Sequence, residues 1–129
     1  APRCRTNIHR GRDGLDQCSP GALEKIYSKT PARWIEVARA NQCLEPLATI
    51  TTPIAVTEKR FGSEPRAHIE ATEDQVLPLS LQRSMQAQLP CDPVFSIDCD
   101  HVLPSSAPDL LTNHLIEIAN RVDRTTANC

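Results

Sequence analysis

Aromatic residues are scarce in this 129-residue chain, which contains one Trp, one Tyr and two Phe. Aromatic side chains supply large buried areas in most protein cores, so a core here must rest mainly on the smaller Leu, Ile, Val and Ala. The length, with 40% hydrophobic and 23% charged residues, fits one globular domain. We expect a modest core and a fold that is less secure on its own.

Strong net charge and long apolar runs are also missing. The formal net charge is -2, which provides no global field for nucleic acid, so no nucleic-acid partner is expected. No run approaches the roughly 18 apolar residues of a membrane-spanning helix, and the N-terminus lacks the apolar core of a signal peptide. We expect a soluble protein with no membrane partner; the compartment stays open, with the cytoplasm favoured. The first residue is Ala1 rather than Met, which suggests a processed or truncated product.

Metal-binding motifs are absent as well. The six cysteines are irregularly spaced and form no CxxC pair. The nearest approach to a cluster, Cys99 with His101, lacks the paired ligands of a structural zinc site. We expect free buried thiols, no metal ion and no cofactor.

The first half of the chain predicts an arm followed by a cap-like segment. Residues 1–17 carry four arginines, two glycines and no apolar periodicity, which predicts a basic arm or unsupported loop. Such an arm can bind an acidic partner, although two aspartates offset its charge and favour a solvated tail. Residues 18–64 predict two short helices and a connector.

The two short helices are predicted by capping signals. Ser19 as N-cap and Pro20 open the first helix, and Thr30 before Pro31 repeats the same device. Two short helices in succession are typical of a cap or lid. The connector that follows, residues 44–65, is rich in Thr and Pro and predicts extended chain, with a short strand at Ile54 to Val56 as one option.

The second half, residues 65–123, predicts a βαβα unit, followed by a tail at 124–129. Strands are expected at 66–71 and 93–98, with a helix at 79–89 between them. Ser105 or Ser106 is expected to cap the last helix. The apolar side of that helix is lined by Leu111, Leu115, Ile118 and Val122, the period expected for a helix lying on a sheet.

A βαβ crossover makes its two strands parallel, so both carboxyl ends lie along one edge of the sheet. Asp74 follows the first strand and His101 follows the second, so both side chains are expected in loops at that edge. Neighbouring strands lie about 4.8 Å apart, which allows the carboxylate to reach Nδ1 of the imidazole. A carboxylate on Nδ1 fixes the histidine tautomer and leaves Nε2 free to take a proton from a serine hydroxyl.

A named resemblance rests on these residues. The stretches "RAHIEATEDQVLPLSLQRSMQAQLP" and "VFSIDCDHVLPSSAPDLLTNHLIEIA" resemble the C-terminal end of the α/β-hydrolases related to plant methylesterases and hydroxynitrile lyases, and their bacterial relatives. The shared features are an acid followed eight residues later by Gln (Asp74 and Gln82), "DH" in the last loop (Asp100 and His101), and Ser106 to Leu110 opening the last helix. The resemblance runs from about residue 18 to residue 122 and is strongest after Pro65.

The resemblance implies the C-terminal part of an α/β-hydrolase fold: the last two parallel strands with their helices, preceded by a helical cap segment. It makes Asp74 the triad acid and His101 the general base of a serine-type carboxylic ester hydrolase. Family members carry a GxSxG-like elbow upstream, and none of the four glycines forms such a motif. We therefore expect the isolated chain to be inactive, because the nucleophile and the oxyanion hole are both missing.

One departure from the family refines the substrate class. A lysine usually follows the histidine in the hydroxynitrile lyases, whereas Val102 stands here. The resemblance therefore implies a small-molecule ester rather than a cyanohydrin. It also implies an apolar pocket under the cap helices around Trp34, although a lone tryptophan on a helical stripe is more often ordinary packing.

Other residues and other functions stay open. Glu73 is the closest rival of Asp74 for the role of the acid. Asp98 and Asp100 are expected to shape their loop. The other histidines have no evident partner: His9, His68 and His114. Capping is the expected task of Ser80, Ser105 and Ser106. A non-catalytic binding module or pseudoenzyme is one alternative function. The other is one chain of a split hydrolase, completed by an N-terminal partner chain or a self-associated copy, because two parallel strands leave an exposed edge.

Overall fold

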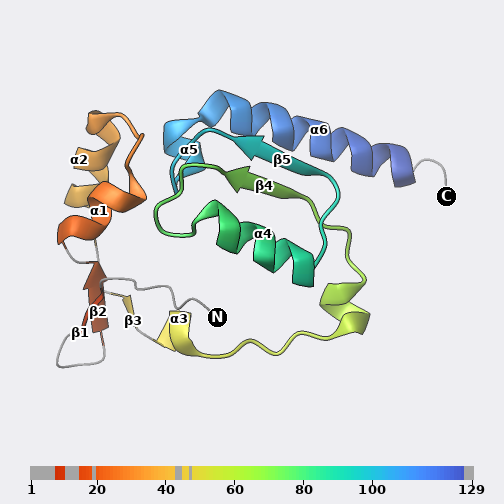
Figure 1. Ribbon diagram of the computed structural model, residues 1–129, viewed down its shortest axis with the longest axis horizontal. Coiled ribbons are helices and arrows are strands. Elements are labelled where there is room, and N and C mark those ends of the chain that lie inside the picture. The colour runs from red at the N-terminus through yellow and green to blue at the C-terminus, as the bar shows by residue number, and fades with distance from the viewer. Residues whose placement is uncertain (1–7, 11–14, 19, 43–44, 47, 127–129) are drawn as a thin grey trace.

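The computed structural model describes residues 8–10, 15–18, 20–42, 45–46 and 48–126. The elements form an N-terminal group and a C-terminal α/β unit (Figure 1). The N-terminal group comprises β1 (Ile8–Arg10), β2 (Leu15–Cys18), α1 (Pro20–Ile26), α2 (Ala32–Ala40), β3 (Glu45–Pro46) and α3 (Ala48–Thr51), and the π-helix η1 (Glu58–Gly62) lies in the connector before the α/β unit. The α/β unit comprises β4 (His68–Ala71), α4 (Leu79–Gln88), β5 (Val94–Ile97), α5 (Leu103–Ser106) and α6 (Pro108–Thr126).

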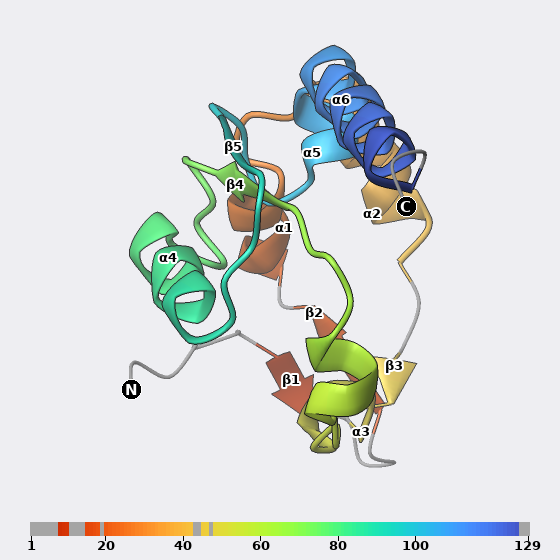
Figure 2. The same ribbon diagram turned by 90° about the vertical axis from the view of Figure 1, so that its right-hand side faces the viewer.

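The two strands of the α/β unit are parallel neighbours, as the sequence predicts. Their register pairs His68 with Val94 and Ala71 with Ile97. The connection through α4 returns the chain to the same end of the sheet, which makes the second strand parallel to the first. Helices α4 and α6 lie on opposite sides of the strands (Figure 2). This arrangement is the α/β class that the sequence predicts.

The core of the α/β unit is small. It consists of Ala71, Ile97 and Cys99, each at most 3% exposed. Four partly buried side chains from β4, α5, α6 and the residue between the two helices pack against it: Ile69, Leu103, Ala107 and Leu111. The scarcity of large side chains in the sequence agrees with this limited core.

The apolar stripe of α6 is only partly used, in contrast to the prediction. Leu111 packs on the core, but Leu115 and Val122 are 52% and 46% exposed. The 19 residues of α6 span about 28 Å, whereas the four residues of β5 span about 13 Å. The helix therefore extends beyond the strands (Figure 1).

Part of the segment expected to be a basic arm is a β-hairpin. Strand β1 pairs antiparallel with β2, with Ile8 opposite Cys18, and β3 pairs with the other edge of β2. The prediction of an arm or unsupported loop is therefore wrong for residues 8–10 and 15–17. Backbone pairing between the strands does not require the apolar periodicity that the sequence lacks there. The rest of the expected arm lies outside the described residues.

Both helices of the cap-like segment are present, and α1 begins at Pro20 as expected, but the start of α2 and the connector differ from expectation. Ser19 lies outside the described residues. Thr30 makes no N-cap bond to α2, whose N-cap is Pro31. The optional strand at Ile54 to Val56 is not formed, and those two side chains are 85% and 61% exposed. The connector instead contains α3 and η1.

The serines expected to cap helices in the second half do not have this role. Ser105 and Ser106 lie inside the short helix α5, and the Ser106 hydroxyl donates to the Val102 carbonyl at 3.2 Å. Helix α4 begins after Pro78 with no side-chain cap, so Ser80 does not cap it either. Proline at the helix starts supplies the required backbone angle without a capping side chain.

Within the described residues, no helix combines the length and apolar composition needed to cross a bilayer.

A buried carboxylate ties the sheet to α4. Glu70 is 4% exposed and accepts hydrogen bonds from Arg83 Nε at 3.0 Å, Arg83 Nη2 at 3.1 Å, Gln86 at 3.2 Å and Ser96 at 2.8 Å. The Arg83 guanidinium is the main cause that lowers the pKa of Glu70 to about 2; burial opposes it, and Ser96 and Gln86 add to it. Because Ser96 lies on β5, this one side chain joins both strands to the helix.

Replacing Glu70 with Gln is expected to lower the free energy of unfolding by about 2 kcal/mol at pH 7, because the charge-assisted bonds are lost. The ionised form of Glu70 stabilises the fold fully above its ordinary pKa of 4.5, and that contribution is lost as the pH falls toward about 2. Urea unfolding at pH 7 and pH 3 measures both effects. The variant should lose less stability between these pH values than the wild type. Exposed Glu64 provides the control, Glu64→Gln, and an equal effect at both positions would contradict the prediction.

Candidate active site

The structure brings Asp74 and His101 together. The Asp74 Oδ2 atom lies 2.9 Å from Nδ1 of His101, across 27 residues of sequence. The strand pairing causes this contact, because the ladder continues past the strand ends: Thr72 donates to the Ile97 carbonyl at 3.0 Å, and Glu73 donates to the Cys99 carbonyl at 3.1 Å. The two loops therefore leave the sheet side by side.

The two oxygens of Asp74 have different partners. Oδ1 accepts the backbone N–H groups of Val76 at 2.7 Å and Leu77 at 2.9 Å, while Oδ2 faces His101. The Asp74 side chain is 5% exposed and the His101 side chain is 34% exposed. An ionised carboxylate only accepts hydrogen bonds, so the proton of the neutral imidazole belongs on Nδ1. That tautomer leaves the lone pair on Nε2, on a ring that solvent can reach.

Three other acidic side chains near the strand ends have different surroundings. Glu73 is exposed, and Glu70 is held by Arg83 at α4. Asp98 forms an ion pair with the Lys29 ammonium group. Asp74 is therefore the carboxylate that contacts the imidazole of His101.

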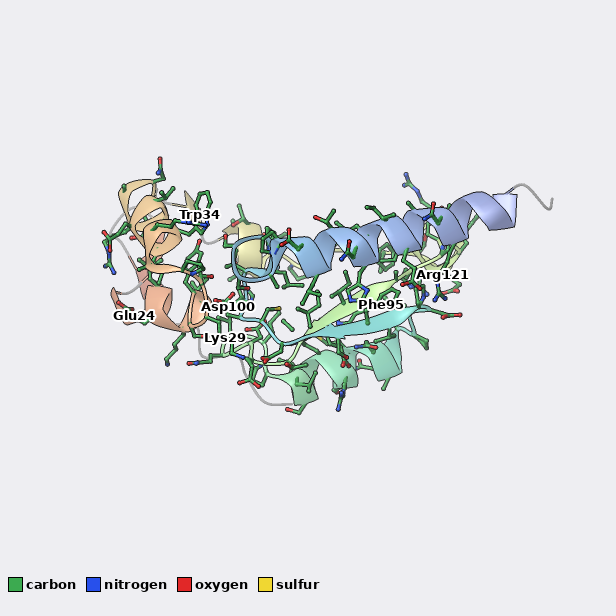
Figure 3. The ribbon with its side chains drawn as sticks, turned by 90° about the horizontal axis from the view of Figure 1, so that it is seen from above. Glu24, Lys29, Trp34, Phe95, Asp100 and Arg121 are labelled. Carbon is green, nitrogen blue, oxygen red and sulfur yellow. The ribbon has the colours of Figure 1, made fainter. Side chains whose placement is uncertain are left out.

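Asp100 makes a contact that the sequence did not predict. Its carboxylate is fully buried and accepts hydrogen bonds from Lys29 N at 2.9 Å, Thr30 Oγ1 at 2.8 Å and Val102 N at 3.0 Å. Figure 3 shows Lys29 beside Asp100, where the turn after α1 meets the loop after β5. Only the bond to Val102 fits the expected loop-shaping role. The other two fasten the cap-like segment to the residue that precedes His101, and the sequence carried no signal for them because Thr30 resembled a helix cap.

Burial alone raises the pKa of Asp100, but the hydrogen bonds from Lys29, Thr30, Val102 and Ser106 outweigh it, and the net pKa is lowered. The adjacent thiol behaves in the opposite way. Burial raises the pKa of Cys99, and the negative charge of Asp100 raises it further. Cys99 is 1% exposed and therefore stays a protonated core thiol rather than a nucleophile beside His101.

Metal ligands do not converge in the part of the chain that the structure describes: no group of three or more His, Cys, Asp or Glu side chains could hold an ion there. The remaining histidines lie in secondary-structure elements. His114 stacks on Phe95 with ring centroids 4.3 Å apart, and His68 lies in β4. His9 lies in β1.

A cavity of about 510 Å³ reaches both Asp74 and His101. It runs along β4 and the adjoining face of α4, and most of its lining is apolar: Ile69, Leu77, Met85, Leu89 and Leu103 are among the lining residues. Trp34 does not line it, and this side chain lies on α2 at a distance from the strands (Figure 3). Two side-chain nitrogens in the lining residues, Arg66 Nε and His68 Nε2, are buried without a hydrogen-bond partner.

The sequence is similar to plant methylesterases. It is 33% identical to putative methylesterase 19 of Arabidopsis thaliana over 101 residues, covering 76% of this chain and 39% of that protein. Methylesterase 3 of Arabidopsis thaliana is 32% identical over 101 residues, covering 76% of this chain and 38% of that protein. The chain thus spans about two fifths of the length of these relatives. No family model matches the sequence.

Solved structures give the same answer for the fold. A variant of tomato methylketone synthase I complexed with beta-ketoheptanoate superposes with a TM-score of 0.74 at 26% identity, covering 91% of this chain and 50% of that one. Polyneuridine aldehyde esterase superposes with a TM-score of 0.73 at 19% identity, covering 88% of this chain and 47% of that one.

The chain has part of an α/β-hydrolase fold. Its homologues are methylesterases, and the expected fold class, part of an α/β-hydrolase fold with two parallel strands and their helices, is confirmed. The similarity covers about half of each solved α/β-hydrolase chain.

Proposed function

We propose that this α/β-hydrolase chain supplies the acid and the general base of a serine-type carboxylic ester hydrolase. The contact of 2.9 Å between Asp74 and His101 is the observation on which the proposal rests. With Asp74 on Nδ1, the imidazole accepts the proton of an attacking hydroxyl at Nε2 and returns it to the departing alcohol. Asp74 stays ionised throughout and stabilises the imidazolium.

The nucleophile comes from outside these 129 residues. The sequence has no GxSxG elbow, and the buried Cys99 thiol is protonated. The oxyanion hole, which depends on the N–H group after the nucleophile, comes with it. The isolated chain is accordingly inactive toward esters, and the substrate of the completed enzyme is a small-molecule ester.

The open edge of β4 supports a completing polypeptide. Within the described residues, β4 pairs only with β5, and alternate residues of a strand point their backbone groups to opposite edges. His68 and Thr72 donate toward β5, so Ile69 points its N–H and C=O the other way, along the cavity. A strand with exposed backbone groups beside an apolar cavity is a template for pairing with another strand.

The large exposed surface supports the same proposal. The accessible surface is 9733 Å², against roughly 6,800 Å² expected for a compact monomer of this length. Many large apolar side chains contribute to it, and such exposure marks surfaces that are covered by other protein. Those most exposed are Ile54, Val56, Met85, Leu110, Leu115 and Ile116. An N-terminal hydrolase segment fits this surface, and a second copy of the chain is the alternative.

Complementation tests the proposal. The chain is co-expressed with the part of Arabidopsis methylesterase 3 that lies outside the match, and the purified complex is assayed with p-nitrophenyl acetate. We expect hydrolysis by the complex and none by the chain alone at any concentration. Size-exclusion chromatography of the chain alone shows whether the chain self-associates. This result distinguishes a second copy from a partner chain as the completing polypeptide.

Three results would contradict the proposal in different ways. Ester hydrolysis by the chain alone would show that its own residues include a nucleophile. A stable complex that hydrolyses no ester would favour the binding module or pseudoenzyme. A complex whose activity survives loss of the serine in the supplied elbow would also contradict the assignment.

A further inference from the structure

We infer that Gln82 is a positioning residue that holds the acid loop so that Asp74 faces His101. This inference rests on the proposed function, because it concerns the same acid and base. Gln82 lies in the first turn of α4 and is 6% exposed, and its hydrogen bonds go to backbone groups of Ala71 and Leu77 rather than to the imidazole. Its effect on catalysis must therefore pass through the loop that carries Asp74.

The Gln82 amide joins the two ends of that loop. Its Nε2 donates to the Ala71 carbonyl at 2.9 Å and to the Leu77 carbonyl at 2.7 Å, and its Oε1 accepts the Ala71 N–H at 3.1 Å. Ala71 is the last residue of β4, and Leu77 is the last loop residue before Pro78 and α4. The amide orientation follows from these partners, because only Nε2 can donate to two carbonyls and only Oε1 can accept an N–H.

The same bonds also close the edge of the sheet at Ala71. The N–H and C=O of Ala71 point away from β5, toward the edge where another strand would pair. Gln82 satisfies both groups, as a neighbouring strand would. Strand pairing on that edge must therefore stop at Ala71, and the chain is free to turn into the acid loop.

The loop transmits this constraint to Asp74 through the backbone. Leu77 has its carbonyl held by Gln82 and its N–H held by Asp74 Oδ1 at 2.9 Å. The Asp74 N–H donates to the Ala71 carbonyl at 3.4 Å, the same carbonyl that accepts from Gln82. Two short paths therefore connect the amide to the carboxylate. Without Gln82, the loop ends can separate, and Oδ2 loses its fixed distance from the imidazole.

The test uses the full 129-residue chain, with ¹⁵N shifts of the imidazole nitrogens reporting the His101 tautomer and amide hydrogen exchange reporting the loop. Gln82→Met keeps the side-chain length but removes all three hydrogen bonds. Gln82→Glu is nearly isosteric, keeps the acceptor and removes both donors, and serves if the Met variant fails to fold. Gln88→Met is the matched control, because Gln88 lies exposed on the same helix.

We expect Gln82→Met to reduce the Nδ1–H share of His101. We also expect the Val76 and Leu77 amides to exchange about tenfold faster or more, since three hydrogen bonds that hold the loop ends are lost. The hydrogen-exchange rate of the Ile97 amide in the core should change less than the rates of the Val76 and Leu77 amides. Gln88→Met should leave all of these unchanged. In an Asp74→Asn background, adding Gln82→Met should change the tautomer no further, because the effect passes through Asp74.

An unchanged tautomer in folded Gln82→Met and Gln82→Glu would overturn the inference. Equal acceleration of all amides with an unchanged tautomer would also overturn it, since that pattern indicates a purely structural role. Neither readout requires catalysis. A failure of the complementation assay therefore contradicts the proposed function without affecting this test.

Discussion

Replacing His101 with Ala is expected to abolish ester hydrolysis by the completed enzyme, lowering kcat/KM by about 10⁴-fold or more. His101 supplies the Nε2 lone pair, and removal of the base leaves the nucleophilic hydroxyl protonated. Most of the loss should appear in kcat, because the imidazole acts in the transition state rather than in substrate binding. Steady-state kinetics with p-nitrophenyl acetate measures the change in the complemented enzyme.

His114→Ala is the matched control for His101→Ala. His114 stacks on Phe95 along α6 and belongs to the same chain and fold, but it lies apart from Asp74. Its loss should change kcat by less than about threefold, a difference of under 1 kcal/mol in the barrier. A His101→Ala enzyme that retained a tenth of the wild-type kcat/KM would contradict the assignment of the general base.

Asp100→Ala is expected to reduce the free energy of unfolding by about 3 kcal/mol, because three donors lose their buried acceptor at once. The donors are the Lys29 N–H, the Thr30 hydroxyl and the Val102 N–H. Asp98 provides the control: it lies two residues away and pairs with Lys29 at the exposed surface, so Asp98→Ala should cost less than about 1 kcal/mol. Urea unfolding followed by circular dichroism measures both variants.

The Asp100 contribution should also depend on pH. The folded-state pKa of Asp100 is lowered, so its stabilising effect is complete above the ordinary carboxyl pKa and is lost as the pH falls through the lower folded value. Asp100→Asn should therefore flatten this part of the acid unfolding curve. An Asp98→Ala variant as unstable as Asp100→Ala would show that the ion pair, rather than the buried carboxylate, fastens the segments.

The fold of the second half was predictable because its signals are local. Apolar periodicity and length separate the strands near His68 and Val94 from the helix between them, and a crossover fixes their parallel pairing. The hairpin near the N-terminus was missed for the opposite reason. Its strands are three and four residues long, and they are stabilised by backbone pairing that no side-chain pattern reveals.

The exposed part of α6 shows a further limit of periodicity. Leu115 and Val122 follow the apolar spacing of Leu111, yet only Leu111 reaches the core of this chain. A repeating pattern states which side of a helix avoids water, but it does not state how far the covering sheet extends. That depends on strand length and on which other strands join the sheet.

The contact between Asp74 and His101 could be anticipated, but its supporting residues could not. Two polar residues after parallel strands must share an edge, so spacing alone brought them into one region. Which of the two acids, Asp74 or Glu73, contacts the histidine depends on where the hydrogen-bonded ladder between the strands ends. It ends at Glu73, one residue before Asp74. The sequence shows Gln82 eight residues after Asp74, but only the tertiary structure shows that its side chain bonds to both ends of the loop.

By itself the sequence determined the α/β class, the parallel strands and the region in which an acid and a histidine meet. These follow from periodicity and from the geometry of a crossover, which are local properties of the chain. Only the tertiary structure decided that Asp100 fastens Thr30, that Gln82 closes the acid loop and that the edge at Ile69 is open. Those contacts join residues that are distant along the chain, and hydrogen bonding between them depends on placement to within about half an ångström, which no spacing in the sequence encodes.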